Sequence, residues 1–416
     1  MNTTERWRRM LAGEPGEEIL VDLGTSTVTG VRAPGAGELA ETVGYVGHPV
    51  LQTLTLDTGD TAALGSDFAR AGLVYDQPAI VDDTYTDPFG VEWLWAEGAP
   101  APLNHPLEHA DFLAAARHPR PEWPKMMQAG PAGEARPLVV ADAPCSGLLE
   151  TCFGLRNSWQ FMIDITDNWR VANALLDWAL ETVATGYERM LSSLPAQPDV
   201  VLYGDDYGFQ GGMFLSDEDF RTFVRPRLRT LFSRIRRMTP AAICFHCCGA
   251  VRPILGDLAD LGIELINLQY DAKGMELSAV RSALPRGIVL HGYTDLRALG
   301  VALSAKDRKS VAVLTDELVR SAPVIAAPVD SLATEQELLD AARAALFVHT
   351  LSADDIDRLR RLGPVRSVLE HAAEVVDEQF DMALTGRRPE VTFLSAASSR
   401  TPSWLGNDAD QTQEGR

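Results

Sequence analysis

The amino-acid sequence predicts an α/β fold, a (β/α)8 TIM-type barrel with an irregular N-terminal cap region and a disordered C-terminal tail. The main observation is that, from about residue 137, short apolar runs alternate with amphipathic segments of helical length. Buried parallel strands are continuous apolar runs joined by helices, so this succession indicates a parallel sheet. The chain has 416 residues, 46% of them hydrophobic, a length at which a barrel with insertions still forms one unit.

Six apolar runs and six helical segments make up the predicted barrel core. The predicted strands are Pro137–Asp142, Asp199–Asp205, Ala241–His246, Ile263–Asn267, Gly287–His291 and Pro323–Ala327. The predicted helices are Trp169–Leu191, Ser216–Met238, Val251–Leu261, Glu276–Leu284, Ala305–Ser321 and Thr334–Leu346. Ser216 precedes three acidic residues and is therefore a predicted N-cap, and Ser304 and Thr334 can cap later helices in the same way.

The rest of the chain divides into two flanking regions. Residues 1–136 form the predicted N-terminal cap region, which is rich in Gly, Pro and Thr after an early barrel strand at Glu18–Leu23. Residues 137–393 hold the barrel core and C-terminal helices. Residues 394–416 are polar, and we expect this tail to be disordered.

Charge and composition narrow the possible functions. Lys and Arg total 37 against 58 Asp and Glu, and the net charge of −21 repels phosphate backbones and anionic membranes. No segment reaches the ~20 apolar residues of a membrane helix, and the N-terminus has no signal-peptide core. Five cysteines, two of them adjacent, suit a reducing compartment. We therefore expect a cytoplasmic globular protein that binds neither nucleic acid nor membranes.

Polar and metal-binding residues recur where the apolar runs stop. Catalytic groups of (β/α)8 barrels lie at the carboxyl ends of several strands, so this recurrence predicts an active site there. The residues are Asp205, Asp206, His246, Cys247, Cys248, Asn267, Gln269, His291, Asp295 and Asp330.

His246 and Cys248 form the most informative pair. Imidazole and thiolate are preferred zinc ligands, and a turn at the end of a strand can place both side chains of an H-x-C pair on one ion. Zinc would hold the thiol as a nucleophilic thiolate. The alternative is a buried histidine with cysteines that only pack, because free cysteine is among the most buried residue types.

Asp205 and Asp206 are adjacent, so their side chains leave the strand in different directions. We expect separate tasks, with one carboxylate facing the barrel mouth and the other capping a turn. A carboxylate in the mouth could orient a cationic substrate, accept a proton or support a metal-bound histidine. The alternative is a turn aspartate that only accepts hydrogen bonds from backbone amides.

At these positions the sequence resembles the uroporphyrinogen decarboxylase superfamily, over roughly residues 3–348. The resemblance begins with Arg6–Pro15, and its strongest parts are Gly204–Gly212 and His246–Gly249. It implies a (β/α)8 barrel. True uroporphyrinogen decarboxylases carry an arginine-containing loop near the N-terminus, whereas Gly24–Gly30 of this chain contains no arginine.

The sequence is more similar to the branch of zinc-dependent methyltransferases that work with corrinoid proteins. Members of that branch bind zinc through an H-x-C pair and a cysteine after a later strand. His246 and Cys248 match the pair, and Asp330 stands in place of the cysteine. Because carboxylate is also a zinc ligand, the resemblance implies a His246, Cys248 and Asp330 site.

The first hypothesis is thus a methyltransferase that moves a methyl group between a small substrate and a corrinoid protein at a zinc site. The chain has no Asp-x-His-x-x-Gly corrinoid signature, so the corrinoid would be carried by a partner. The resemblance also implies a homodimer. The predicted catalytic residues are Asp205, Asp206 and His246, and the predicted substrate-binding residues are Gln210, Gln269, His291 and Asp295.

Two other hypotheses remain open from the sequence. One is a metal-free decarboxylase or lyase that acts on a small carboxylic acid, with Asp205 and His246 as acid–base groups. The other is a barrel without activity that serves as a binding or scaffold protein. The clustering of titratable residues at strand ends favours an enzyme.

Overall fold

The computed structural model describes residues 2–14, 19–23, 31–32, 54–55, 65–74, 81–82, 84–96, 99–123, 126–128, 137–329 and 335–386. Within these residues, every helix is too short or too polar to cross a membrane. The predicted tail 394–416 lies outside the described part of the chain.

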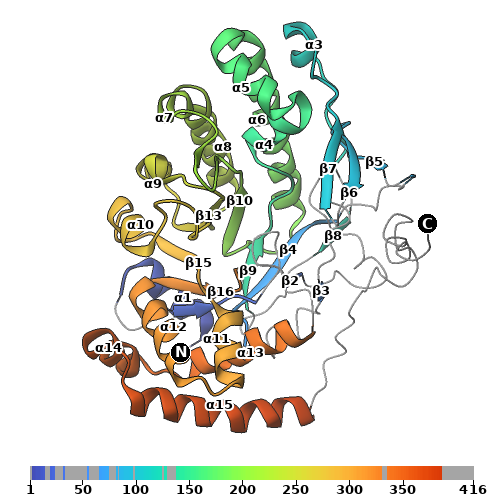
Figure 1. Ribbon diagram of the computed structural model, residues 1–416. Coiled ribbons are helices and arrows are strands. Elements are labelled where there is room, and N and C mark those ends of the chain that lie inside the picture. The colour runs from blue at the N-terminus through green and yellow to red at the C-terminus, as the bar shows by residue number, and fades with distance from the viewer. Residues whose placement is uncertain are drawn as a thin grey trace, which may run out of the picture.

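Eight parallel strands form the centre of the molecule (Figure 1). From β4 to β16 these strands lie side by side in their order along the chain, and β1 pairs with β16. An additional strand, β8 (Met126–Gln128), joins β4 in antiparallel orientation. The parallel strands are β1 (Ile19–Val21), β4 (Phe68–Val74), β9 (Leu138–Ala141), β10 (Val200–Gly204), β13 (Ala242–Cys247), β14 (Leu265–Leu268), β15 (Val289–Asp295) and β16 (Val324–Ala327).

Asp67 closes the ring between β1 and β4. Its backbone N–H donates to the Val21 carbonyl at 2.8 Å, and its carboxylate accepts the Val21 N–H at 2.9 Å. The Ser66 hydroxyl accepts the Leu23 N–H at 3.0 Å. Side chains thus complete a junction at which no strand ladder forms, and the sequential order of eight parallel strands is that of a (β/α)8 barrel.

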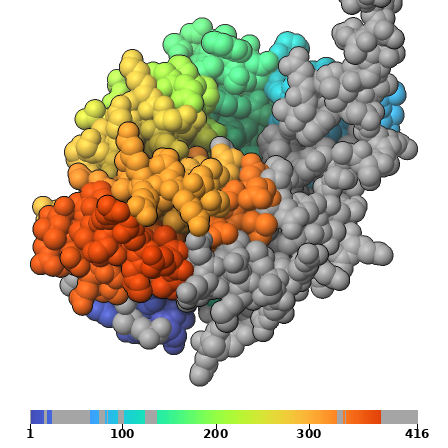
Figure 2. All heavy atoms as spheres, turned by 60° about the horizontal axis from the view of Figure 1, so that its bottom comes forward, coloured from blue at the N-terminus to red at the C-terminus, as the bar shows by residue number. Residues whose placement is uncertain are grey.

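Helices cover the outside of the barrel (Figure 1). Helix α6 packs against α8, α11 packs against α13, and α13 packs against α15. The helices after β9 are α4 (Leu148–Arg156), α5 (Ser158–Asp167), α6 (Trp169–Ser193), α7 (Asp217–Asp219), α8 (Arg225–Met238), α9 (Leu255–Ala259), α10 (Leu277–Ala283), α11 (Leu296–Ser304), α12 (Arg308–Ser321), α13 (Glu335–Thr350), α14 (Ala353–Leu362) and α15 (Arg366–Gly386). In Figure 2, which brings the lower side of Figure 1 forward, the C-terminal helices form a continuous orange-to-red surface.

The barrel interior changes from apolar to polar along its axis. Alternate residues of the strands, such as Val200, Cys244 and Leu265, form an interior apolar cluster that is separate from the larger cluster under the helices. Helix α1 (Thr3–Leu11) contributes Trp7 and Met10 to this interior cluster. The next inward positions of β13, β14 and β15 are the polar residues His246, Asn267 and His291, which places these side chains at the mouth of the barrel.

Residues 81–123 form an antiparallel sheet and a short helix beside α4, α5 and α6. The buried Arg156 guanidinium ties the two parts together, because it donates to the Leu107 and Ala110 carbonyls and pairs with Asp164 at 2.7 Å. Trp178 donates its indole N–H to the His118 carbonyl at 2.7 Å. The elements are β5 (Thr84–Thr86), β6 (Glu92–Ala96), β7 (Ala99–Asn104) and α3 (Phe112–Ala116), and the remaining short strands are β2 (Val31–Arg32), β3 (Leu54–Thr55), β11 (Gly208–Phe209) and β12 (Gly212–Met213).

The predicted strands are confirmed, and two details of the prediction are wrong. The six apolar runs and the early run at Glu18–Leu23 all contain parallel strands. Strand β4 was not predicted, because Arg70 interrupts its apolar run and is buried against Asp22. Ser304 ends α11 instead of capping the next helix, and Asp307 caps α12 by accepting from the Lys309 and Ser310 amides. Ser216 is an N-cap as predicted, whereas Thr334 lies outside the described residues.

Candidate functional site

Three inward-facing polar residues form a row across neighbouring strands at the barrel mouth. In the parallel register, His246 of β13 is opposite Asn267 of β14, and Asn267 is opposite His291 of β15. Each residue lies two positions beyond an apolar interior residue, so the period-two alternation of the strand turns it inward. The strand pattern therefore places two imidazoles and one amide side by side.

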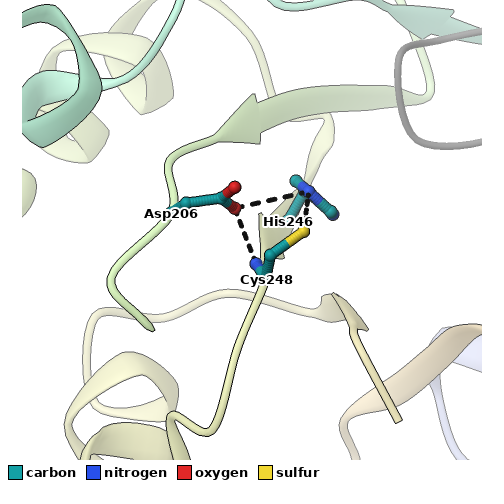
Figure 3. Close-up of side chains that lie close together, drawn as sticks. All are labelled: Asp206, His246 and Cys248. Carbon is teal, nitrogen blue, oxygen red and sulfur yellow. Dashed lines mark hydrogen bonds and ion pairs between the residues drawn. The ribbon is translucent and has the colours of Figure 1, made fainter. Parts of the chain in front are cut away.

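His246, Cys248 and Asp206 converge beside this row (Figure 3). The His246 Nε2 atom lies 3.4 Å from Cys248 Sγ and 3.7 Å from Asp206 Oδ1. One ligand atom from each residue lies within 4.8 Å of the others. Asp206 follows β10 and Cys248 follows β13, and the Cys248 N–H donates to Asp206 Oδ1 at 2.7 Å. The triad therefore joins two adjacent strand ends.

The donor set and its spacing fit a zinc ion. Zinc–nitrogen, zinc–oxygen and zinc–sulfur bonds of roughly 2.0, 2.1 and 2.3 Å at tetrahedral angles imply N···S and N···O separations of about 3.5 and 3.4 Å. The separations from His246 Nε2 to Cys248 Sγ and to Asp206 Oδ1 are 3.4 and 3.7 Å. Three protein ligands with a free fourth position are typical of catalytic zinc sites rather than structural ones.

The surroundings of the Cys248 thiol oppose the loss of its proton. Burial raises the pKa of this thiol well above its usual value, and the Asp206 charge raises it further. Both effects disfavour a thiolate near a carboxylate in a partly buried site. A cation between the two groups would remove this repulsion, so the site is built to favour the thiolate only with a positive charge in place.

A chain of hydrogen bonds determines which nitrogen of His246 faces the triad. The Asn267 amide donates to the His291 carbonyl at 3.0 Å, and a carbonyl can only accept, so Asn267 Oδ1 must point to His246. That oxygen lies 2.8 Å from His246 Nδ1, which must carry the proton. In the neutral ring, His246 Nε2 is then the nitrogen that carries a lone pair toward Cys248, as a metal ligand requires.

The same chain continues into the barrel interior. Asn267 Nδ2 also lies 3.0 Å from His291 Nδ1, and His291 Nε2 lies 3.0 Å from Asp22 Oδ2. Arg70 donates to the same Asp22 oxygen at 2.8 Å. The carboxylate can only accept, so it holds the His291 proton on Nε2 and leaves Nδ1 to accept from Asn267. His291 is buried, and its ring contacts Asn267 on one side and Asp22 on the other.

Of the two tasks predicted for the aspartate pair, facing the barrel mouth and accepting hydrogen bonds from the backbone at a turn, Asp205 has the second. Its carboxylate is fully buried and accepts the N–H groups of Leu149 and Glu150 in the first turn of α4, both at 2.9 Å. It also accepts the hydroxyls of Tyr203 and Tyr207 at 2.8 and 2.7 Å. Burial raises the pKa of Asp205 to about 6, and the four donors oppose that shift. Asp205 thus anchors α4, while Asp206 faces the mouth.

The turn after Cys248 depends on a glycine. Gly249 has a φ of +86°, and a Cβ at this position would lie 2.2 Å from the Gly208 carbonyl carbon. The close approach lets the Phe209 carbonyl accept the Ala250 N–H at 2.9 Å. Gln269 supports the same turn, because its Oε1 accepts the Gly249 N–H at 2.9 Å. The β11–β12 hairpin and Gln269 therefore hold Cys248 in position from two sides.

Three other predicted residues are not part of the triad. Gln210 is exposed on the β11–β12 hairpin, and Asp295 caps α11 by accepting the Arg297 N–H at 2.9 Å. Asp330, the predicted third metal ligand, lies outside the described residues. The substrate-binding roles of Gln210, Gln269, His291 and Asp295 stay predictions.

Four supporting residues were not assigned a role from the sequence. The tyrosines Tyr203 and Tyr207 flank Asp205, and Asp22 and Arg70 lie far from the triad in the chain. Only the charge of Arg70 inside an apolar segment signals a buried partner, because charged side chains are rarely buried without one.

Comparisons with known proteins agree with this architecture. Residues 154–326 match the family model described as uroporphyrinogen decarboxylase (URO-D). The match covers less than half of the 416 residues, so it shows a similarity to this family over that stretch. The matched residues run from α4 to β16 and include the whole triad. No curated protein sequence matches the chain.

Two of the solved structures that match the chain are described here. A methyltransferase from Methanosarcina mazei superposes with a TM-score of 0.55 and 19% identity, over 83% of this chain and 98% of that chain. This likeness confirms the TIM-type fold. A dihydropteroate synthase from Yersinia pestis, solved with a sulfonamide drug, has a TM-score of 0.24 and 12% identity, over 49% of this chain and 86% of that chain, a score too low to bear on the fold.

Proposed function

We propose that this URO-D-like chain is a methyltransferase that moves a methyl group between a small substrate and a corrinoid carried by a partner protein. The observation that carries the proposal is the His246, Cys248 and Asp206 triad at adjacent strand ends of the barrel. The fold shared with a methyltransferase supports it. The active site of this fold lies at the carboxyl ends of the strands, where the triad lies.

His246, Cys248 and Asp206 would hold a zinc ion. Bound zinc supplies a Lewis acid and lowers the pKa of a thiol or water that occupies its free position. His246 offers an unprotonated Nε2 because Asn267 holds the proton on Nδ1. Asp206 Oδ1 fixes the Cys248 backbone by accepting its N–H. The predicted role of Asp330 as a metal ligand in place of one of these three residues stays a prediction.

The geometry gives less support to a metal-free lyase. That hypothesis uses Asp205 and His246 as the acid–base pair, and acid–base groups must come within hydrogen-bond reach of the substrate. Asp205 has no exposed surface, and four donors from the chain already occupy its oxygens. A homodimer and a cytoplasmic location also stay predictions.

Metal analysis tests the proposed function directly. Protein purified without chelators should contain about one zinc per chain by mass spectrometry, and the Cys248→Ala variant should contain little. Cys244→Ala is the matched control, because Cys244 is buried among the apolar residues of the barrel interior and is not one of the triad residues, so the zinc content should stay unchanged. In the cobalt-substituted protein, the sulfur-to-metal charge-transfer band should disappear in Cys248→Ala only. Zinc-free wild-type protein with full methyl-transfer activity would overturn the proposal.

A further inference from the structure

A cavity of about 550 Å3 lies between the end of α11, the start of α12 and the first half of α15 (Figure 1). Small-molecule sites have volumes of roughly 300–1,000 Å3, so this cavity is large enough for a ligand of several heavy atoms. None of the three triad residues lines it, so the two sites are separate. The buried part of its wall is apolar and includes Leu303, Val311, Leu369 and Val376.

The cavity reverses the charge balance of the chain. The whole sequence has 37 Lys and Arg against 58 Asp and Glu, but four cationic and two anionic side chains line the cavity. They are Lys306, Arg308, Lys309, Arg366, Glu370 and Glu374. Asp307, which caps α12, adds one nearby negative charge and leaves the local balance positive. An anionic group is therefore attracted to this cavity, although the molecule as a whole repels it.

Two of the four cationic side chains are already paired, and the other two are available to a ligand. Arg308 and Arg366 both contact Glu370, at 3.2 and 2.7 Å, so that carboxylate is neutralised from two sides. No carboxylate of the described residues lies within 4.0 Å of the ammonium group of Lys306 or Lys309. A lysine ammonium group is a point charge on a flexible stem, so both groups can move to meet an anion.

Lys306 occupies a position at which glycine is favoured. It follows the end of α11 with a φ of +54°, a left-handed conformation that is rare for a residue with a long side chain. Its N–H donates to the Leu303 carbonyl at 3.0 Å, and the Asp307 N–H donates to the Ala302 carbonyl at 2.9 Å, which together form a Schellman motif. The backbone favours glycine here, so the local structure gives no reason for a lysine. A ligand in the cavity gives this side chain a task that offsets the strain.

We propose that this cavity binds an amphipathic carboxylate of the fatty-acid type, with the carboxylate at Lys306 and Lys309 and the alkyl chain against the buried apolar wall. The head group accepts charge-assisted hydrogen bonds from the two ammonium groups. The alkyl chain leaves water on binding, which is the main favourable contribution of the apolar wall. The binding does not depend on the proposed metal centre, because the two sites share no residue.

Three ligands with one alkyl chain and different head groups test the proposal on the wild-type protein. Octanoate, octan-1-ol and octylammonium are titrated into the full chain by calorimetry. We expect octanoate to bind about fivefold more tightly than octan-1-ol, as one or two partly exposed ion pairs allow, and octylammonium not to displace it. Acetate, which has the head group without the chain, should not bind. Equal affinities for octanoate and octan-1-ol, or for octanoate and acetate, would overturn the proposal.

The Lys306→Gly variant separates ligand binding from folding. Glycine suits a φ of +54°, so the melting temperature should stay the same or rise. Octanoate binding should weaken about threefold, since one of the two head-group contacts is lost, while binding of octan-1-ol stays unchanged. A lower melting temperature or an unchanged octanoate affinity would contradict the role assigned to Lys306.

Two further variants locate the binding in this cavity. Lys309→Gln removes the second ammonium group and should also weaken octanoate binding about threefold. Lys273→Gln is the matched control, because Lys273 is exposed and does not line the cavity. Ala373→Phe places a ring in the cavity and should prevent the binding of both octanoate and octan-1-ol. Equal effects of the two lysine variants, or wild-type octanoate affinity in a folded Ala373→Phe protein, would overturn the proposal.

A carboxylate is also a ligand for a metal ion, so the Cys248→Ala variant is titrated with octanoate as well. Because Cys248 does not line the cavity, this variant should keep its octanoate affinity within about twofold of the wild-type value. Loss of octanoate binding in Cys248→Ala would assign the ligand to the triad and overturn the cavity proposal.

Discussion

His246 Nδ1 and Asn267 Oδ1 lie 2.8 Å apart, and this hydrogen bond decides the chemistry of the opposite ring nitrogen. The bond holds the proton on Nδ1 and leaves the Nε2 lone pair directed at Cys248 Sγ, 3.4 Å away. The Asn267 amide, oriented by the His291 carbonyl, thus sets the ring orientation and tautomer of His246, one of the three candidate ligands.

Asn267→Leu should lower the zinc affinity about 10- to 100-fold, the usual effect of losing a residue that orients a metal-bound histidine. The change removes the acceptor for His246 Nδ1–H but leaves all three triad residues in place. A competition titration against a zinc chelator measures the effect. Asn173→Leu, on the outer helix α6, is the control and should bind zinc as the wild type does. Equal affinities for the Asn267→Leu variant and the wild type would show that the hydrogen bond has no role in metal binding.

Asp206→Asn should weaken zinc binding with little loss of stability. The amide oxygen can still accept the Cys248 N–H, so the turn keeps its hydrogen bond. The variant loses the negative charge, and neutral amide oxygen is a poorer zinc ligand than carboxylate. We expect the free energy of unfolding to stay within about 0.5 kcal/mol of the wild-type value, as for most partly exposed positions. A variant with full zinc occupancy against the chelator would exclude Asp206 as a ligand.

Asp205→Ala should strongly lower the stability of the protein, unlike the change at the neighbouring Asp206. Four buried donors from α4, Tyr203 and Tyr207 lose their acceptor. Since each unsatisfied buried donor costs about 1–3 kcal/mol before relaxation, we expect a loss of roughly 3–5 kcal/mol in the free energy of unfolding. Urea denaturation measures this loss. A destabilisation below about 1 kcal/mol would contradict the anchoring role of Asp205.

Gly249→Ala should damage both stability and metal binding. The new Cβ would collide with the Gly208 backbone at a φ of +86°, so the turn that holds Cys248 must move. Gly256→Ala in α9 is the matched control, since nothing lies within 4 Å of the added Cβ. That control should raise stability by about 0.5–1 kcal/mol, the usual gain for alanine in a helix. Thermal unfolding and zinc content distinguish the two variants, and a Gly249→Ala protein with normal zinc content would contradict the close packing.

The strands of the barrel could be predicted because each is a continuous apolar run between amphipathic helices. The exception is β4, whose sequence contains Arg70, and only the fold shows that this charge meets Asp22 inside the barrel. A pattern of hydrophobicity cannot predict such a strand, because the partner that makes the charge tolerable lies elsewhere in the chain.

The sequence predicted which residues belong to the candidate site, but not which of them contact one another. His246 and Cys248 share one strand end, so their proximity follows from local spacing. The role of Asp206 depends on the register that sets Gly204 opposite His246, and register comes from side-chain packing across the two strands. The division of tasks between Asp205 and Asp206 was predicted, whereas their assignment needed the position of α4.

The junction at Asp67 has a consequence for how the protein is made. Strand β1 pairs with β16, whose residues follow about 300 positions later in the chain. At the usual rate of translation, roughly 15–60 s separate the synthesis of these two strands. Throughout that interval one edge of β1 has no ladder partner, and the other has only the few bonds of Ser66 and Asp67. The nascent chain must therefore keep its first strand from pairing elsewhere until the last strand leaves the ribosome.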